Sequence, residues 1–344
     1  MPSGRLRSAC LLAAICLAFF SVAPMAGARP GTRRAKETAQ QRLERLRARA
    51  RATFRLAENS AASGHGPRKG TPGGQGRGFS PEVQVTSGIP GTQSETAIAV
   101  FDNNVVVGFN QFDPGAPTKR SGVAFSTDGG LTFTDVGGLP VPGLNQTLLG
   151  DPSVTACGDG KFYYSSIYFP NLTDSALSVS VGTVSGANMS WTLPTAAIAS
   201  TNDFLDKEWM TCDRLTDTLY MTYTRFVNGN VGDSTELRIE MIKSVNGGAS
   251  WTAPLVLESS ATESLEICYV ATGPNSEVYT MWERGIDDLT APNTKLEFRR
   301  SLNQAASFDP KVVVRTMTPS FYPAPVGFNR ESTFEIGTLA VDLS

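Results

Sequence analysis

Short, largely apolar runs alternate with polar turns along most of this chain. Residues 97–100, 153–156, 209–212 and 268–271 are such runs, and each is followed by a turn rich in Asp, Asn or Gly and by a second apolar or aromatic run. Segments of this length, bounded by turn residues, predict β-strands rather than helices. The same plan, extended by a third and a fourth strand, recurs four times between residues 94 and 314.

A polar, glycine-rich turn follows the third strand of the repeat. Residues 126–133 read STDGGLTF, and residues 244–251 read SVNGGASW, 118 residues later. Ser and Asp side chains bond to their own turn backbone, and glycine adopts positive φ without a steric clash. Residues 301–308 (SLNQAASF) form a degenerate copy, and Ser190 and Trp191 stand where another copy is expected. The closing aromatic residues are 58, 60 and 57 residues apart, a period that predicts an array of β-sheet blades.

These repeats predict an all-β protein, a β-propeller of four-stranded blades. About four to five blades fit into residues 79–344, because residues 332–342 have the pattern of a fifth first strand. Residues 81–85 have the pattern of an outermost strand supplied by the N-terminal side. Propellers have about four to eight blades, and six blades of this length would need more residues than 79–344 contain. We therefore expect a truncated chain, or a propeller whose closure is completed by something else.

The first residues have the layout of a secretory signal. Arg5 and Arg7 precede an apolar run over 9–22, and residues 26–28 (AGA) offer a small-residue cleavage site. The apolar run is short for a membrane span, and no later stretch is a candidate for one. We predict a signal peptide over 1–28 and a secreted, extracytoplasmic protein without a transmembrane segment.

Charge divides the remaining chain into two parts. Residues 29–78 hold thirteen Lys and Arg against three Glu, a balance of +10, whereas residues 79–344 hold fifteen against twenty-nine Asp and Glu, a balance of −14. The basic part predicts a partly helical arm over 36–59 and a flexible Gly/Pro-rich linker over 60–78. Such an arm could bind an anionic surface, or it could be a solvated arm or propeptide. The acidic part disfavours nucleic acid as a specific partner.

Three cysteines follow the predicted signal: Cys157, Cys212 and Cys268. Exported proteins usually pair their cysteines, but an odd number leaves at least one thiol free. Cys157 and Cys212 occupy matching places in neighbouring repeats, where a thiol is most simply a small core hydrophobe. No cysteine or histidine spacing is typical of a metal site, and the single histidine, His65, lies in the linker. We therefore expect no metal, no cofactor and no histidine-based catalysis.

The pattern Ser-x-Asp-x-Gly-x-Thr-aromatic resembles the Asp-box of sialidases and related BNR-repeat proteins, and the resemblance spans about residues 94–342. It implies a six-bladed propeller, a glycan or glycoprotein as partner, and glycoside hydrolysis of the exo-α-sialidase type. Residues 88–90 read GIP where those enzymes have Arg-Ile-Pro. We expect the Asp-boxes to be structural. Their residues here are Ser126, Asp128, Gly130, Phe133, Ser244, Asn246, Gly248 and Trp251.

Candidate chemistry lies on the opposite rim, at the start of the first strands and the end of the second strands. Asp206 and Glu208 are candidate acids if partial burial raises their pKa. Arg225, Arg284 and Arg330 are candidates for an anion site by position, because a guanidinium binds a carboxylate bidentately. The alternative is that these charges pair with one another at the surface.

Three functions of different classes remain open from the sequence. The first is a secreted glycosidase of the sialidase type, active when its propeller is complete. The second is a non-catalytic propeller that binds a glycan or a protein. The third is a structural component of the cell envelope, held there by the basic arm.

Overall fold

The computed structural model describes residues 82–86, 93–111, 120–143, 145–230, 233–285, 294–317, 321–323, 332–334 and 337–341. These residues form β-strands and turns, without a helix among them, which confirms the predicted all-β class. In the same described part, no helix is long and apolar enough to cross a membrane. The predicted signal peptide and basic arm, residues 88–90 and Arg330 lie outside the described residues.

Three of the four blades are simple antiparallel sheets in which consecutive strands are neighbours. The first blade contains β1 (Gln93–Phe101), β2 (Asn104–Gln111), β3 (Ser121–Ser126) and β4 (Thr134–Gly138). The third contains β11 (Phe204–Asp213), β12 (Thr218–Val227), β13 (Glu236–Ser244) and β14 (Leu255–Ser260). The fourth contains β15 (Leu265–Thr272), β16 (Val278–Arg284), β17 (Thr294–Ser301) and β18 (Val312–Met317).

The second blade follows the same plan with two of its strands interrupted. Its strands are β5 (Thr147–Leu148), β6 (Ser153–Ala156), β7 (Phe162–Phe169), β8 (Ser175–Ser185), β9 (Asn188–Trp191) and β10 (Thr195–Ser200). Both β5 and β6 pair with β7, and both β9 and β10 pair with β8. The short segments together fill the first and fourth strand positions, so this blade also is four strands wide.

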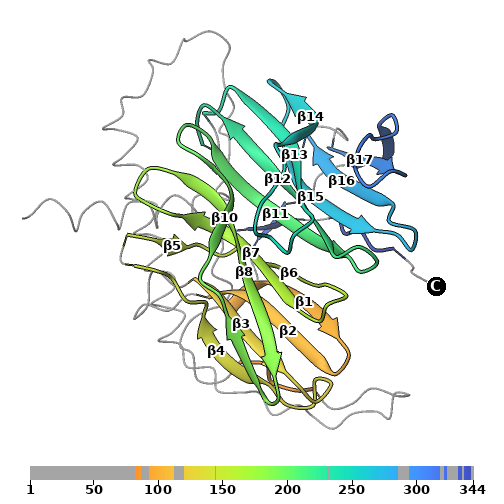
Figure 1. Cartoon of the computed structure of the whole chain (residues 1–344). Helices are drawn as coiled ribbons and strands as arrows, with labels where there is room; N and C mark the ends of the chain where they lie inside the picture. The colour runs from red at the N-terminus through yellow and green to blue at the C-terminus, as the bar shows by residue number, and fades with distance from the viewer. Residues whose placement is uncertain are drawn as a thin grey trace, which may run out of the picture. The chain divides into compact units, whose positions relative to one another are not determined.

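The four blades are arranged as a β-propeller with the first strands innermost. In Figure 1, β1, β6, β11 and β15 lie toward the centre of the fan of sheets. Hydrogen bonds join neighbouring inner strands: the Met210 backbone N–H donates to Ser153 Oγ at 2.9 Å, and that of Cys212 donates to Thr155 Oγ1 at 3.1 Å. We call β1, β6, β11 and β15 the inner strands.

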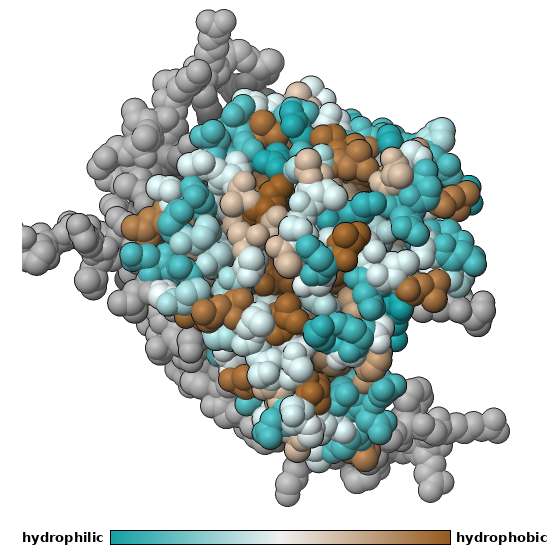
Figure 2. Space-filling view, viewed as in Figure 1, coloured by the Kyte–Doolittle hydropathy of each residue, from teal (hydrophilic) through white to brown (hydrophobic). Residues whose placement is uncertain are grey.

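Apolar side chains fill the spaces between blades. One core cluster joins the first two blades and includes Val106, Val123 and Tyr164; another joins the third and fourth and includes Tyr220 and Trp282. All five of these side chains are fully buried. On the molecular surface, apolar and hydrophilic residues are interspersed over the face in Figure 2. The apolar runs of the sequence therefore bury themselves between sheets, as blade packing requires.

Two predicted strands differ from the structure. Residues 332–334 form β20 (Ser332–Phe334), which pairs with β19 (Phe321–Pro323) in a hairpin rather than beginning a fifth blade. This hairpin belongs to a compact unit separate from the four blades. Residues 82–86 contain no strand. The apolar alternation of both segments predicted strand conformation, but whether a strand joins a blade depends on its tertiary partners.

Candidate functional site

A non-glycine residue with left-handed backbone stands at the N-terminal end of every inner strand. These residues are Glu95 (φ 51°), Asp151 (φ 52°), Lys207 (φ 51°) and Ile267 (φ 58°). In β1, β11 and β15 they lie at a β-bulge, where the pairing register shifts. This conformation costs of the order of 1–3 kcal/mol per residue, and it persists where the surrounding structure enforces it, often at functional sites. The recurrence in four blades directs attention to this end of the inner strands.

Lys207 brings three blades together at this place. Its Nζ lies 2.7 Å from Asp151 Oδ2 of the second blade and 3.3 Å from Glu95 Oε2 of the first. Burial opposes the positive charge, but attraction by Asp151 and Asp206 outweighs it and raises the pKa of the Lys207 ammonium. The side chains of Lys207 and Asp151 retain 16% and 14% exposure, so a ligand could reach them.

We call the charged residues gathered here the inner-strand cluster. Its members either pair with Lys207 or interact electrostatically with it or with its partners. They are Glu95, Asp151, Asp206, Lys207, Glu208 and Glu266. One ammonium therefore faces five carboxyl groups, and the cluster as a whole favours a neutral or cationic ligand over an anion.

The first blade holds Asp151 in place through its backbone. The Asp151 N–H donates to Asn110 Oδ1 at 2.7 Å, and the Gly150 N–H donates to Ser121 Oγ at 3.1 Å. Gly150 has φ 97°, and a Cβ there would lie 2.3 Å from Asn110 Oδ1. Only glycine fits at position 150, where the backbone passes close to the Asn110 side chain. The loop therefore holds the Asp151 carboxylate in a defined position.

The two predicted acids, Asp206 and Glu208, flank Lys207 on β11. They are 2% and 3% exposed. Asp206 Oδ1 accepts from the Lys207 N–H at 2.8 Å. Among the described residues, neither carboxyl oxygen of Glu208 has a hydrogen-bond partner. Burial, and then the charge of Asp151, raise the pKa of both carboxyl groups well above their ordinary values.

The predicted anion-binding residue Arg225 binds carboxylates of its own blade. Its Nε lies 2.8 Å from Glu240 Oε2, and its Nη1 lies 2.7 Å from Asp203 Oδ2. The same oxygen of Glu240 also accepts from the Tyr223 hydroxyl at 2.6 Å. Glu240 is buried, so the guanidinium supplies the charge that balances it.

Arg284 repeats this arrangement in the fourth blade. Its Nε lies 3.2 Å from Glu297 Oε2, its Nη1 lies 2.6 Å from Glu263 Oε2 and its Nη2 lies 2.9 Å from Glu258 Oε1. The indole N–H of Trp282 donates to Glu297 at 2.9 Å, as the Tyr223 hydroxyl does to Glu240. The contacts of both arginines favour the alternative in which these charges pair with one another.

The Asp-box residues form the turns between third and fourth strands. In the first turn Ser126 Oγ donates to Asp128 at 2.7 Å and accepts from the Gly130 N–H at 2.9 Å, and Asp128 accepts from the Thr132 N–H at 2.9 Å. In the second turn Gly248 donates to Ser244 in the same way. There, Asn246 accepts from the Ser250 N–H. The hydrogen bonds are local to each turn, and Phe133 and Trp251 follow as partly buried rings.

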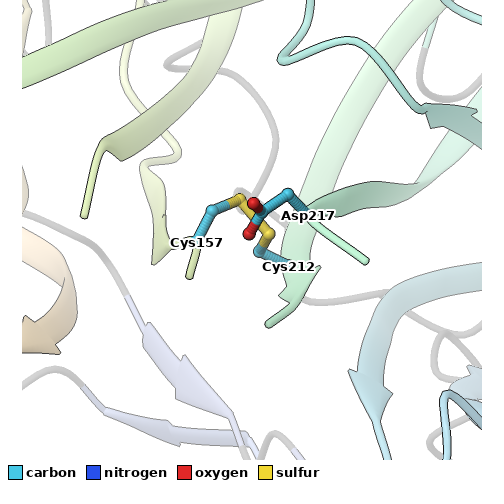
Figure 3. Close-up of side chains that lie close together, drawn as sticks. All are labelled: Cys157, Cys212 and Asp217. Atoms are coloured by element: carbon cyan, nitrogen blue, oxygen red, sulfur yellow. A yellow bond between two sulfur atoms is a disulfide. The ribbon is translucent and has the colours of Figure 1, made fainter. Parts of the chain in front are cut away.

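A disulfide between Cys157 and Cys212 connects the second and third blades, with a Cα–Cα distance of 5.3 Å. The sequence predicted two core thiols here; both residues are buried, but they are bonded, because adjacent blades bring equivalent positions together. Asp217 lies beside the sulfur atoms (Figure 3). Its Oδ1 accepts from the Gly158 N–H at 2.6 Å. Sulfur atoms in a disulfide are not thiolate ligands for a metal, so these residues form a structural cross-link between two blades. Cys268 is a free, buried thiol.

No protein-family model matches the chain, and no curated protein matches it either. Solved structures do match. An α-L-arabinanase of Penicillium chrysogenum, complexed with arabinobiose, is 14% identical, with a TM-score of 0.51 over 72% of this chain and 76% of that one. A GH93 α-L-arabinofuranosidase of Fusarium graminearum, also with arabinobiose, is 16% identical, with a TM-score of 0.50 over 72% and 75%. At this identity the likeness shows the fold.

A sialidase from a Hadza microbial source matches with a TM-score of 0.41 and 10% identity, which is too low to support an argument. The fold is therefore a β-propeller of the type found in glycoside hydrolases, without a specific link to sialidases. The propeller class predicted from the repeats is confirmed at this level.

Sequence reasoning placed Asp206 and Glu208 on the functional rim but did not include Glu95. The missing signal was positional. Glu95, Asp151 and Lys207 are spaced 56 residues apart, close to the repeat period, and each stands two residues before one of the apolar runs 97–100, 153–156 and 209–212. Aligning the repeats on the start of these apolar runs, rather than on the Asp-box, would have identified Glu95.

Proposed function

We propose that this chain is a glycan-processing propeller that hydrolyses a neutral glycan at the inner-strand cluster. The observation that carries the proposal is the Glu208 carboxyl group, which is buried without a hydrogen-bond partner among the described residues. The charge of the ion-paired Asp151 adds to burial in raising the pKa of Glu208. Glycoside hydrolysis generally uses two carboxyl groups, one protonated and one ionised. Burial keeps a carboxyl group protonated, and a neighbouring ammonium keeps one ionised.

The charge of the cluster supports a neutral substrate rather than a sialoside. Five carboxyl groups surround one ammonium, and a substrate carboxylate would meet net repulsion there. Carboxylates of its own blade engage Arg225, and Arg284 is engaged by Glu297 of its own blade and by Glu258 of the third blade. The two similar arabinan-active proteins were solved with arabinobiose, and this makes pentose oligosaccharides the first neutral substrates to test. Exo-α-sialidase activity is the second candidate, supported by the Asp-box resemblance.

The test is turnover by the purified full chain on arabinobiose, longer arabinan oligosaccharides, other neutral oligosaccharides and sialosides. We expect product release from a neutral glycan and a decrease of about 10²–10⁴-fold in Glu208→Gln, the usual contribution of an acid or base group. Glu236→Gln is the matched control, because Glu236 lies on β13 in a partly exposed pair with Arg238. It should retain full turnover.

Three other outcomes would contradict the proposal in different ways. Turnover of sialosides alone would favour the second candidate. Binding of a glycan without hydrolysis would favour a non-catalytic propeller. Full turnover by Glu208→Gln would show that the chemistry takes place elsewhere.

We also propose that the protein is exported. The disulfide between Cys157 and Cys212 supports this, because disulfides persist mainly in oxidising compartments. Fusing residues 1–28 to a reporter enzyme should export it, whereas the same reporter with Arg5 and Arg7 changed to Glu should be exported less. Retention of the unaltered fusion in the cytoplasm would contradict export.

A further inference from the structure

Asp151 and Glu208 have opposite surroundings although they belong to one cluster. Asp151 lies 2.7 Å from the Lys207 ammonium and keeps 14% of its side chain exposed. Glu208 is 3% exposed, and neither of its carboxyl oxygens is hydrogen-bonded within the described part of the chain. The first setting stabilises a carboxylate, whereas the second stabilises a carboxylic acid.

The groups around Glu208 add to this difference. Asp151 precedes β6, Asp206 and Lys207 directly precede Glu208 on β11, Tyr164 is on β7, and Cys268 is on β15. Among these groups Lys207 alone is a cation, and its Nζ is directed to Asp151 and Glu95 rather than to Glu208. Burial raises the pKa of the Cys268 thiol to about 12, so this residue brings no charge to Glu208 near neutral pH. Burial also raises the pKa of the Tyr164 hydroxyl above its ordinary value, so Tyr164 is likewise neutral.

We propose that Lys207 is a positioning residue that gives two carboxyl groups different protonation states: it holds Asp151 ionised while Glu208 keeps its proton. This inference rests on the proposed function for its biological meaning, since hydrolysis of a glycosidic bond needs one group of each kind. It can be tested without any substrate, because the protonation states belong to the free protein.

Lys207 reaches this position because of its backbone. Its φ of 51° belongs to a β-bulge between Asp206 and Trp209, so two residues there oppose no regular partner on β12. The bulge directs Lys207 to Asp151 and Glu95, while Asp206 and Glu208 on either side are buried. The strained conformation therefore places the ammonium between blades.

Infrared spectroscopy of the full chain measures the proposal directly, through the carbonyl stretch of protonated carboxyl groups at neutral pH. We expect the unaltered protein to have a protonated-carboxyl band that decreases in Glu208→Gln. The part of the band that Glu208→Gln removes should persist in Asp206→Asn. In Lys207→Met a further protonated-carboxyl band, beyond those of Glu208 and Asp206, should appear, and it should be absent from the double variant Lys207→Met/Asp151→Asn. Lys207→Arg, which keeps the charge, should resemble the unaltered protein.

Two results would overturn the inference. One is a band that Glu208→Gln leaves unchanged, since Glu208 would then be ionised. The other is a Lys207→Met variant that folds, by its circular dichroism, and gains no protonated carboxyl. If Lys207→Met does not fold, the Glu208→Gln comparison still decides the state of Glu208. A new protonated-carboxyl band in Lys207→Arg would also contradict the proposal, because this variant keeps the positive charge at position 207.

A substrate readout separates this inference from the proposed function. If a neutral glycan is hydrolysed, Lys207→Met should change the acidic limb of the kcat/KM profile, because Asp151 loses its ion-pair partner. Lys207→Arg should leave that limb unchanged. If no glycan is hydrolysed but the infrared results hold, the proposed function fails and the division of protonation states remains.

Discussion

The guanidinium of Arg225 lies 2.8 Å from Oε2 of Glu240, a carboxylate that is 2% exposed. Arg284 and Glu297 repeat the pair one blade later. In each blade an aromatic side chain also donates a hydrogen bond to the buried carboxylate: Tyr223 to Glu240 and Trp282 to Glu297. A charge pair that recurs with its hydrogen-bonding ring in successive blades is part of how the blade is built.

Removing the guanidinium should therefore be strongly destabilising. Arg225→Met leaves Glu240 buried without its counter-charge, and we expect the free energy of unfolding to fall by about 3–5 kcal/mol. Arg238→Met, which breaks a partly exposed pair with Glu236 on the same sheet, should cost only about 0–1 kcal/mol. Urea denaturation of both variants measures the difference, and similar small losses would show that Glu240 adapts without Arg225.

The disulfide should contribute to stability by linking two blades. Cys157 and Cys212 are 55 residues apart, and the chain-entropy description assigns such a loop about 4 kcal/mol. We expect the Cys157→Ser/Cys212→Ser variant to lose about this much free energy of unfolding under oxidising conditions. Cys268→Ser is the control for removal of a cysteine outside the disulfide. A double variant as stable as the unaltered protein would show that blade packing suffices.

The acid stability of the first Asp-box turn should depend on Asp128. Hydrogen bonds from the Thr132 side chain and backbone, followed by that from Ser126, lower its pKa from the ordinary 3.8 to about 2. A lowered pKa in the folded state gives stability that is present above 3.8 and is lost as the pH falls toward 2. Asp128→Asn should remove this part of the pH dependence while keeping the turn, because Asn246 occupies the same place in the second turn. Thermal unfolding of both proteins across this pH range provides the measurement, and parallel curves would contradict the assignment.

Glu208 should have the opposite effect on stability. Its raised pKa means that the folded protein retains a proton that the unfolded chain has released, so stability falls as the pH rises from the ordinary glutamate value toward the folded one. Glu208→Gln removes this loss. The unfolding temperature of the variant relative to the unaltered protein should therefore increase with pH. A difference that is constant with pH would indicate that Glu208 does not titrate across this window.

Much of the fold follows from the sequence because it depends on local and periodic signals. Strand alternation and the turns that begin at Ser126 and Ser244 are short-range features, and their repetition at a near-constant spacing predicts blades. The four sheets and the hydrogen bonds within those turns agree with these signals. Residues 332–334 show the limit, since their pattern predicts a strand but not the strand with which it pairs.

The pairing of charges and sulfurs was decided by tertiary structure. From the sequence, Arg225 could bind a ligand anion or pair with another charged side chain, and Cys157 could be a free thiol or half of a disulfide. These alternatives differ only in distances between residues far apart in the chain, and such distances depend on how adjacent blades pack. The left-handed bulge at Lys207 is likewise a product of packing, because an isolated lysine disfavours that conformation.

The sequence by itself therefore determined the architecture, the Asp-box turns and the rim on which charged residues gather. Tertiary structure alone decided which of those charges neutralise one another within a blade and which meet between blades. The physical reason is that strand and turn preferences act within a few residues, whereas burial and Coulomb energies depend on neighbours in space. Lys207, Asp151 and Glu95 come from three different blades, and only their packing brings them within ion-pair distance.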